Sequence, residues 1–404
     1  MIVSQHISII CILFLGGGAV GKHSLDLIKG NFLVTANNLK PLLAIWPVNS
    51  SDIIQNVKFV LPARANSLAI SPDGCYLIAG IQENIYIWQI ATGKMLAMLS
   101  KHYQPINRIK FVDDGSHFIT GGQDGMVLVW SLSDCIGDQY KMEPVVPLYS
   151  FSDHALPVTD LWVGNCGMRA LLISVSLDRT CKMYDLASGT MLLSVVFQEM
   201  LTAVVMDRVE IGLYVGTNMG NIYHYKMQPA PRTKEYHITD ADKLTNKFAG
   251  HSKTITCLSI SMDEQTLMSG SEDANVMIWN IQSRSLLKTL PHKGAITNAF
   301  FIMTPKVMFN RDAKLDLITS NLQRMIDNND NREQETIEVI VRDNLFEQLH
   351  RNKKKFRVSS NLQPSVSTEE EGNTSEVKKL KAEIEKLKKV NKEMFELSAK
   401  YLIE

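Results

Sequence analysis

The sequence predicts an all-β protein, a β-propeller of about seven blades with a C-terminal α-helical coiled-coil tail. Two observations support the propeller. Short alternating apolar stretches recur as a unit over residues 23–309, and each copy ends its third stretch in an aromatic residue. A third observation supports the tail, because apolar residues at 377–404 follow a heptad pattern.

The first element is the apolar stretch "ISIICILFL" at residues 7–15. It is shorter than the roughly 18 residues of a membrane span. Residues 1–6 before it contain no Lys or Arg, which a signal peptide would carry. We interpret the stretch as a strand that closes the ring, with a secretory signal as the alternative.

The next segment, "GGGAVGKHS" at residues 16–24, has features of a phosphate-binding loop, GxxxxGK[S/T]. Gly16, Gly21 and Lys22 fit that pattern, but His23 stands where the magnesium-binding hydroxyl is required. The strand-like "FLVTA" follows too soon for the helix that such a loop needs. We therefore interpret residues 1–22 as a closing strand and a glycine-rich turn. A nucleotide-hydrolysing enzyme using Gly16 to Lys22 is the less favoured alternative.

The repeat units are expected to form the blades. The clearest copies are "LAISPDGCYLIAGIQENIYIWQI" (68–90), "IKFVDDGSHFITGGQDGMVLVWSL" (109–132) and "LSISMDEQTLMSGSEDANVMIWNI" (258–281). The marker aromatics, spaced by 42, 42, 54, 41 and 54 residues, are Trp46, Trp88, Trp130, Tyr184, Tyr225 and Trp279. Three of these spacings match the roughly 40 to 45 residues of a four-stranded propeller blade, and polar insertions account for the two long ones.

Six blades are expected at residues 23–61, 64–99, 102–150, 154–197, 200–247 and 251–290. The stretch "AITNAFFIMTPKVMF" (295–309) has apolar residues for two more strands. A seventh blade therefore needs a strand from the N-terminus, for which "ISIICILFL" is the candidate. One strand is still missing, so either the last blade is incomplete or the true start lies upstream.

These repeats resemble the WD-repeat (WD40) family. In that family a His at the start of the repeat, an Asp before the third strand and the Trp that ends this strand are linked through a Ser or Thr. The resemblance places these roles on His102, Asp124, Trp130, His154, Asp178, Tyr184, His251, Asp273 and Trp279, with Ser269 or Ser271 as one hydroxyl. A catalytic pair is needed only once, so the recurring offsets indicate a structural network. The blades ending at Trp88 and Tyr225 have Gln82 and Met219 at the Asp position, so no network is expected there.

Several longer stretches are more specific: "LSKHYQPI", "SHFITGGQDGMVLVWSL", "HALPVTDLW", "SGTMLLSVVF" and "VVMDRVEIGLYVG". They resemble the WD subunits of the Rix-one-type ribosome-assembly complex. This resemblance implies a non-enzymatic scaffold in large (60S) ribosomal subunit assembly and rRNA internal transcribed spacer processing. It also implies residence in the nucleus, nucleolus and nucleoplasm, with some in the cytoplasm. A WD-repeat adaptor in signalling or ubiquitin transfer is the alternative.

The same resemblance implies the partners. These are a proline- and glutamate-rich helical-repeat protein, a second helical-repeat subunit, large-subunit ribosomal precursors and, indirectly, an AAA-type remodelling ATPase. No membrane partner is expected, because 42 basic and 42 acidic residues give no overall charge bias. No cofactor is expected either. The six cysteines form no CxxC pair or Cys/His cluster, which predicts reduced thiols in an intracellular protein and no metal site.

Residues 310–376 lose the repeat and are predicted to form a polar, largely disordered linker. Within it, "RNKKKFR" is either a nuclear-localisation or RNA-backbone patch or a solvated charge run. Its basic residues are Arg351, Lys353, Lys354, Lys355 and Arg357.

The seam of the predicted coiled coil consists of Val377, Leu380, Ile384, Leu387, Asn391 and Met394. β-Branched residues at a with Leu at d favour parallel dimers, and Asn391 at an a position fixes the register. We therefore expect self-association through residues 377–404. A single amphipathic helix that docks on the propeller or on a partner is the alternative.

Overall fold

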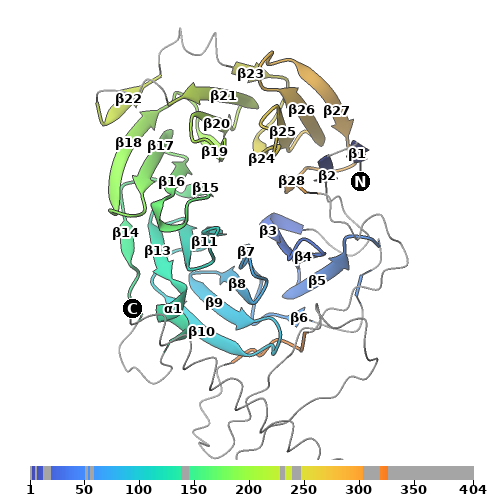
Figure 1. The fold of residues 1–404 in the computed structure, drawn as a ribbon, viewed down its shortest axis with the longest axis vertical. Helices are drawn as coiled ribbons and strands as arrows, with labels where there is room; N and C mark the ends of the chain where they lie inside the picture. Colours follow the sequence, from blue (N-terminus) through green and yellow to red (C-terminus); the bar gives the residue numbers. More distant parts are fainter. Residues whose placement is uncertain are drawn as a thin grey trace, which may run out of the picture. The chain divides into compact units, whose positions relative to one another are not determined.

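The structure is a computed structural model, and it describes residues 2–4, 7–11, 20–50, 53–54, 59–137, 145–227, 233–238, 247–303 and 319–325. The chain divides into two compact units, Met1–Asn328 and Asn329–Glu404, and the described residues all belong to the first. Six sheets of four or five strands follow one another around a ring, with the first strand of each innermost (Figure 1). The unit is therefore an all-β propeller.

The first three blades are sheets of four antiparallel strands. Blade 1 contains β3 (Val20–Ile28), β4 (Phe32–Asn37), β5 (Leu42–Pro47) and β6 (Phe59–Val60). Blade 2 contains β7 (Ser67–Ile70), β8 (Tyr76–Ile81), β9 (Asn84–Gln89) and β10 (Met95–Ser100). Blade 3 contains β11 (Ile106–Phe111), β12 (His117–Gly122), β13 (Val127–Ser131) and β14 (Tyr149–Phe151), with the short helix α1 (Leu132–Ile136) after β13.

In the next three blades, blade 4 gains a fifth strand from the chain segment that connects two strands of blade 5. Blade 4 contains β15 (Val158–Val163), β16 (Leu171–Ser176), β17 (Thr180–Asp185) and β18 (Thr190–Val196), with the 3₁₀ turn η1 (Gly167–Arg169). Blade 5 contains β19 (Leu201–Met206), β20 (Gly212–Thr217), β21 (Asn221–Lys226) and β23 (Lys247–Ala249). Blade 6 contains β24 (Ile255–Ile260), β25 (Thr266–Ser271), β26 (Asn275–Asn280) and β27 (Leu286–Pro291). The predicted insertion in blade 5 adds β22 (Glu235–His237) to blade 4, parallel to β18.

Small residues near the ends of the second strands allow the blades to pack closely. A Cβ added to Gly121 of β12 would lie 2.9 Å from Val158 Cγ1, at the start of the next inner strand. The same close approach recurs from Gly216 to Ile255, at 2.8 Å, and from Gly270 to Ile296. Glycine is therefore the residue that fits at these three contacts between neighbouring blades.

The prediction of seven blades is corrected to six. Between blades 6 and 1 lies a three-stranded sheet of β28 (Ala299–Ile302), β2 (Ile7–Cys11) and β1 (Ile2–Ser4). β2 pairs antiparallel with β28, with Ser8 opposite Ile302, so N-terminal residues close the ring. The N-terminus folds back as a hairpin and adds two short strands, and within the described residues this sheet has three strands.

One boundary is wrong, because residues 20–22 were expected in a glycine-rich turn, but Val20 pairs with Asn37 in β3, and a bulge between Val20 and Leu25 accommodates the extra residues. Of the linker 310–376, which is predicted to be largely disordered, the structure describes residues 319–325, and these lie against blade 2 (Figure 1). Residues 12–19 of the glycine-rich segment lie outside the described part of the chain.

Candidate functional site

The blade 3 network links four buried or partly buried side chains. His102 Nδ1 lies 2.9 Å from Asp124 Oδ2, and His102 Nε2 lies 2.8 Å from Thr120 Oγ1. The Trp130 indole N–H donates to the same Thr120 oxygen at 3.2 Å. With the proton on Nδ1, Asp124 accepts from the ring, Nε2 accepts from the Thr120 hydroxyl, and Thr120 accepts from Trp130. Every polar group of the network then has a partner.

Electrostatics favour an ionised aspartate in this arrangement. Burial alone raises the pKa of the Asp124 carboxyl, but hydrogen bonds from His102 and from two backbone N–H groups outweigh burial and lower that pKa. The Asp273 carboxyl of blade 6 has a lowered pKa for the same reasons. At neutral pH both carboxylates therefore accept hydrogen bonds.

Blade 6 repeats the network and settles which serine takes part. His251 Nδ1 lies 2.9 Å from Asp273 Oδ2, and Nε2 lies 2.7 Å from Ser269 Oγ. The Trp279 indole N–H donates to Ser269 Oγ at 2.9 Å. Ser271, the other serine considered, donates instead to the Lys253 carbonyl oxygen at 3.1 Å.

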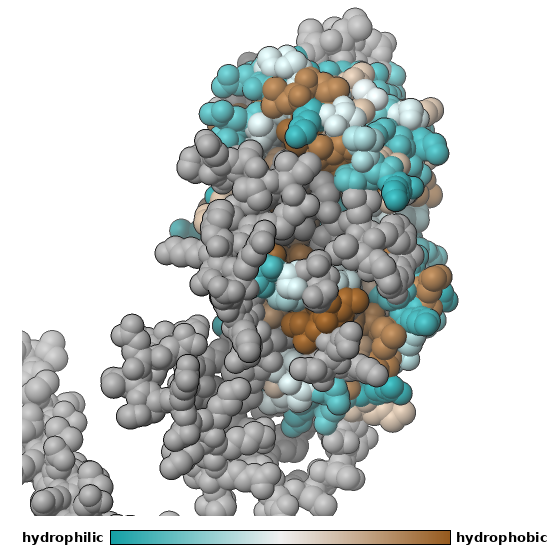
Figure 2. Space-filling view, turned by 90° about the vertical axis from the view of Figure 1, so that its right-hand side faces the viewer, coloured by the Kyte–Doolittle hydropathy of each residue, from teal (hydrophilic) through white to brown (hydrophobic). Residues whose placement is uncertain are grey.

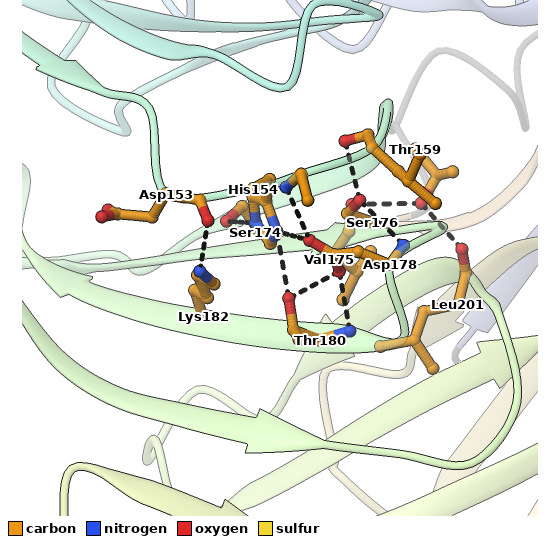
Figure 3. A network of polar contacts seen from close by, with 12 residues as sticks. Asp153, His154, Thr159, Ser174, Val175, Ser176, Asp178, Thr180, Lys182 and Leu201 are labelled. Carbon is orange, nitrogen blue, oxygen red and sulfur yellow. Dashed lines mark hydrogen bonds and ion pairs between the residues drawn. The ribbon is translucent and has the colours of Figure 1, made fainter.

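Blade 4 contains a variant of the network (Figure 3). His154 Nδ1 lies 2.9 Å from Asp178 Oδ2, and Nε2 lies 2.7 Å from Ser174 Oγ. Tyr184 takes the place of the tryptophan, and its hydroxyl donates to Asp153 Oδ2 at 3.1 Å. A hydroxyl group at the far end of the ring reaches a different acceptor from an indole N–H.

Blade 5 has a different network, which sequence reasoning missed. The Glu199 carboxylate accepts hydrogen bonds from Thr217 Oγ1 at 2.6 Å, Asn221 Nδ2 at 2.9 Å and the Tyr223 hydroxyl at 2.7 Å. Burial and this carboxylate both raise the pKa of Tyr223 above its ordinary value, so its hydroxyl stays a donor. Glu199 does not occupy the repeat position of the histidines, and no repeat-based signal points to it.

Residues of the glycine-rich segment lie among the inner strands of distant blades. His23 Nδ1 lies 2.7 Å from Arg108 Nη1 on β11, and His23 Nε2 lies 3.2 Å from the Thr159 carbonyl oxygen on β15. The His23 backbone N–H donates to Asn298 Oδ1 at 2.9 Å. Lys22, which a phosphate loop would use to hold phosphate, donates to the Thr202 carbonyl oxygen on β19 at 3.2 Å. The segment therefore connects blade 1 with three other inner strands and with the residues before β28.

The charges around His23 keep its ring neutral. Burial, followed by the positive charges of Arg108, Lys22 and Lys110, lowers the pKa of His23 well below 6.5. A neutral ring can donate to Thr159 and accept from Arg108 at the same time. The Arg108 charge and burial likewise lower the pKa of Lys110 to about 8.

Arg108 is held by an acidic residue on the next blade. Its Nε lies 3.0 Å from Asp160 Oδ1 as an ion pair, although the N–H is not aligned for a hydrogen bond. Asp160 Oδ2 also accepts the Val204 backbone N–H on blade 5, at 3.1 Å. These polar groups bind one another across blades 1, 3, 4 and 5, which is the role of a structural core and not of a catalytic centre.

The remaining predicted sites fall mostly outside the described residues. The basic residues 351–357 and the heptad seam 377–394 lie in the part that is not described. Among the described residues, no disulfide joins Cys75, Cys135, Cys166, Cys181 or Cys257. In the described ranges no group of three or more His, Cys, Asp or Glu residues could hold a metal ion, and no helix has the length and apolar composition to span a bilayer.

Comparison with known proteins agrees with the blade geometry. The model of the family "WD domain, G-beta repeat" matches residues 93–131, 145–185 and 242–280. WD repeat-containing protein 18 of Homo sapiens is 33% identical over 397 residues, a match that spans 96% of this chain and 91% of that protein. The chain belongs to the WD repeat-containing protein 18 family.

Other relatives of this WD repeat-containing protein 18 family member cover a smaller part of the chain. The Danio rerio protein of the same name is 37% identical over 297 residues, or 74% of this chain and 68% of that protein. The pre-rRNA-processing protein pro-1 of Caenorhabditis elegans is 27% identical over 277 residues, or 68% of this chain and 52% of that protein. The three segments matched by the WD domain model end in blades 3, 4 and 6, which contain the His–Asp networks.

Exposed apolar side chains of this family member gather at one end of blades 3 to 5. We call this set the loop patch, and it consists of Tyr103, Leu156, Met200 and Met219, which are 80%, 46%, 46% and 65% exposed. The first three precede inner strands, and Met219 lies between β20 and β21, so connectivity places all four at the same end of their blades.

On the side of the ring that carries β27, Figure 2 shows apolar residues in separate patches among polar ones.

Proposed function

We propose that the protein is a non-enzymatic scaffold subunit of a nuclear Rix-one-type complex that acts in large (60S) ribosomal subunit assembly and in processing of the rRNA internal transcribed spacer. One observation carries the proposal, the similarity to human WD repeat-containing protein 18 over 96% of the chain. This similarity extends past the propeller unit, which ends at Asn328. The name of the Caenorhabditis elegans relative, a pre-rRNA-processing protein, supports the same process and a nuclear location.

The chemistry of the propeller suits binding and not catalysis. The His–Asp pairs recur in three blades. In each pair the second ring nitrogen of the histidine is hydrogen-bonded to a hydroxyl group of the same blade. Lys22 donates a hydrogen bond to a backbone carbonyl oxygen, and the residues after it form a strand. A phosphate-binding loop requires a helix at this place, so the structure does not support that alternative. Scaffolding therefore depends on the surface of the ring.

We assign the loop patch as the surface that contacts the helical-repeat subunits. Large exposed apolar side chains at one end of a protein are typical of a protein contact, and residues such as Tyr103 supply much of the binding energy at such contacts. The formal net charge of zero makes protein contacts the first expectation, ahead of direct RNA binding.

The test is affinity purification of the tagged full-length protein from nuclear extract, with identification of the recovered proteins and RNA. Recovery of helical-repeat partners and large-subunit precursors supports the proposal. A version that ends at Ser375 should lose a co-purifying second copy of the chain if the tail self-associates. Failure of the full-length protein to recover ribosomal precursors would contradict the assignment and leave a WD-repeat adaptor of another pathway.

Two matched variants test the surface. Met219→Asp in the loop patch should reduce partner recovery about tenfold or more. Val209 lies between β19 and β20, at the opposite end of the same blade, and is 62% exposed. The control variant Val209→Asp should therefore leave partner recovery unchanged. Equal recovery with both variants would exclude the loop patch as the contact surface.

A further inference from the structure

Blade 2 lacks all three polar members of the repeat network. Thr120 of blade 3 pairs with the residue two before Trp130, and the residue at the same place in blade 2 is Ala79, which pairs with Tyr86. Gln82 stands at the Asp position, and no histidine lies between β6 and β7. Trp88 of blade 2 is nevertheless fully buried. A buried indole N–H without an acceptor is costly, so blade 2 needs an acceptor from another part of the chain.

That acceptor comes from a segment that follows the propeller strands. The Trp88 indole N–H donates to the Gln323 carbonyl oxygen at 2.8 Å, across 235 residues of sequence. The Gln323 side-chain Oε1 accepts the Met95 backbone N–H at 3.1 Å, and the Gln323 backbone N–H donates to the Gly93 carbonyl oxygen at 2.8 Å. One glutamine therefore makes three hydrogen bonds to blade 2, and two of them use its backbone.

An apolar side chain and a hydroxyl group extend the contact on the other side. Leu322 is 7% exposed and belongs to the apolar cluster between blades 1 and 2, which includes Trp88 and Met95. The Ser320 hydroxyl donates to the Thr92 carbonyl oxygen. The segment thus runs along the turn between β9 and β10, where it buries a leucine and satisfies backbone groups of the turn (Figure 1).

The turn itself is shaped for a close-lying backbone. Gly93 has a φ of +71°, and a Cβ at this position would meet the Asn321 carbonyl oxygen and the Ser320 side chain. The corresponding turn of blade 6 contains Arg284 at a φ of 54°, so positive φ alone does not require glycine there. The approach of residues 320–321 gives glycine at position 93 a second physical reason.

Blade 1 provides an internal comparison. Its marker Trp46 is also buried, and Thr35, which pairs with Ala44, stands at its hydroxyl position. Among the described residues, Trp46 Nε1 has no hydrogen-bond partner. A missing network therefore does not by itself recruit an acceptor, which makes the fit at blade 2 specific.

We propose that the β9–β10 side of blade 2 is a peptide-docking site whose ligand is an extended segment with a leucine followed by a glutamine, and that residues 319–325 of this chain occupy it. The site recognises the leucine by the apolar cluster and the glutamine by Met95 and Gly93. The Trp88 indole N–H binds a carbonyl oxygen of the peptide backbone. Docking fixes the place on the propeller from which the C-terminal part of the chain continues, independently of any ribosomal role.

The test compares two aspartate substitutions in the full-length chain by hydrogen–deuterium exchange. Leu322→Asp places a charge in the apolar cluster, and Met325→Asp changes a residue that is 80% exposed three positions later. We expect Leu322→Asp to accelerate exchange at residues 93–100 about tenfold, with blade 6 unchanged, and Met325→Asp to have no effect. Equal exchange in the two variants would overturn the proposal.

A milder change covers the case in which Leu322→Asp unfolds the propeller. Gln323→Ala removes only the side-chain acceptor of the Met95 amide and keeps the backbone bond to Trp88. The Met95 amide should then exchange faster while β26 of blade 6 does not change, and an unaltered Met95 rate would contradict the assigned contact. An excess of a synthetic peptide of residues 317–327 should restore protection at 93–100 in Leu322→Asp, and failure to do so would refute the ligand assignment.

Discussion

The imidazole of His23 accepts a hydrogen bond from the guanidinium of Arg108 at 2.7 Å, and this contact joins blade 1 to blade 3, which are not neighbours in the ring. His23 also has a φ of +57°, a conformation that L-residues rarely adopt. The contacts of the side chain to β11 and β15 therefore compensate for an unfavourable backbone conformation. His23 connects blades that sequence order keeps apart.

Replacement of His23 should separate the side-chain contribution from the backbone strain. His23→Ala loses both ring hydrogen bonds while it keeps the strain, so we expect a loss of about 1 to 3 kcal/mol in the free energy of unfolding. His23→Gly loses the same bonds but tolerates the positive φ, and should be up to about 1 kcal/mol more stable than His23→Ala. Urea unfolding of both variants measures the difference, and a less stable glycine variant would contradict it.

The two buried serines of β25 offer a matched pair. Ser269→Ala leaves His251 Nε2 and the Trp279 indole N–H without a partner, and should reduce the free energy of unfolding by about 2 to 4 kcal/mol. Ser271→Ala removes bonds only to backbone groups of Lys253 and Asp273, and should cost about 1 kcal/mol. Thermal and urea unfolding compare the two, and equal losses would show that the network adds nothing to stability.

His224 should make stability depend on pH. Burial, then the charges of Arg284 and Lys226, lower the pKa of His224 to about 4. A histidine with a pKa below its unfolded value of about 6.5 contributes stability that is complete above pH 6.5 and is lost as the pH falls towards 4. His224→Phe keeps a ring against Tyr214, whose ring centroid lies 4.6 Å away, but cannot be protonated.

The measurement is the free energy of unfolding of both proteins between pH 7 and pH 4. The variant should lose less stability over this interval than the protein with His224. Parallel curves would show that His224 has an ordinary pKa in the folded state.

Gly121 tests the packing between blades 3 and 4. In Gly121→Ala the new Cβ would lie 2.9 Å from Val158 Cγ1, and such overpacking costs about 1 to 3 kcal/mol. Val158→Ala removes the obstructing methyl group. The double variant should therefore be more stable than the sum of the two single losses implies, and strict additivity in a double-mutant cycle would contradict the packing explanation.

Repeat spacing explains which part of the site could be predicted. His102 and Asp124 are 22 residues apart in sequence, and His251 and Asp273 have the same separation, so one pattern located both pairs. Most of the strand pairing followed from the same periodicity, because each blade apart from the added β22 is built from strands in sequence order. The spacing of residues along the sequence was therefore enough to predict these contacts.

Contacts between distant segments could not be predicted in this way. Glu199 and Gln323 satisfy blades 5 and 2, but neither occupies a repeat position, so no spacing connects them with Tyr223 or Trp88. Sequence reasoning considered His23 only as the residue at the hydroxyl position of a phosphate loop, whereas the bulge in β3 places it against blades 3 and 4. Such pairings depend on the closed ring and not on local sequence.

The pairing of β2 with β28 has a consequence for synthesis of the protein. A chain emerges from its N-terminus, so the strand containing Ser8 is made early, whereas its partner around Ile302 is made after all six blades. Until then β2 is paired only with β1, and its other edge is open and can associate with other nascent chains. Ring closure is therefore a late, long-range step, and we expect newly made chains to depend on a chaperone that covers this edge.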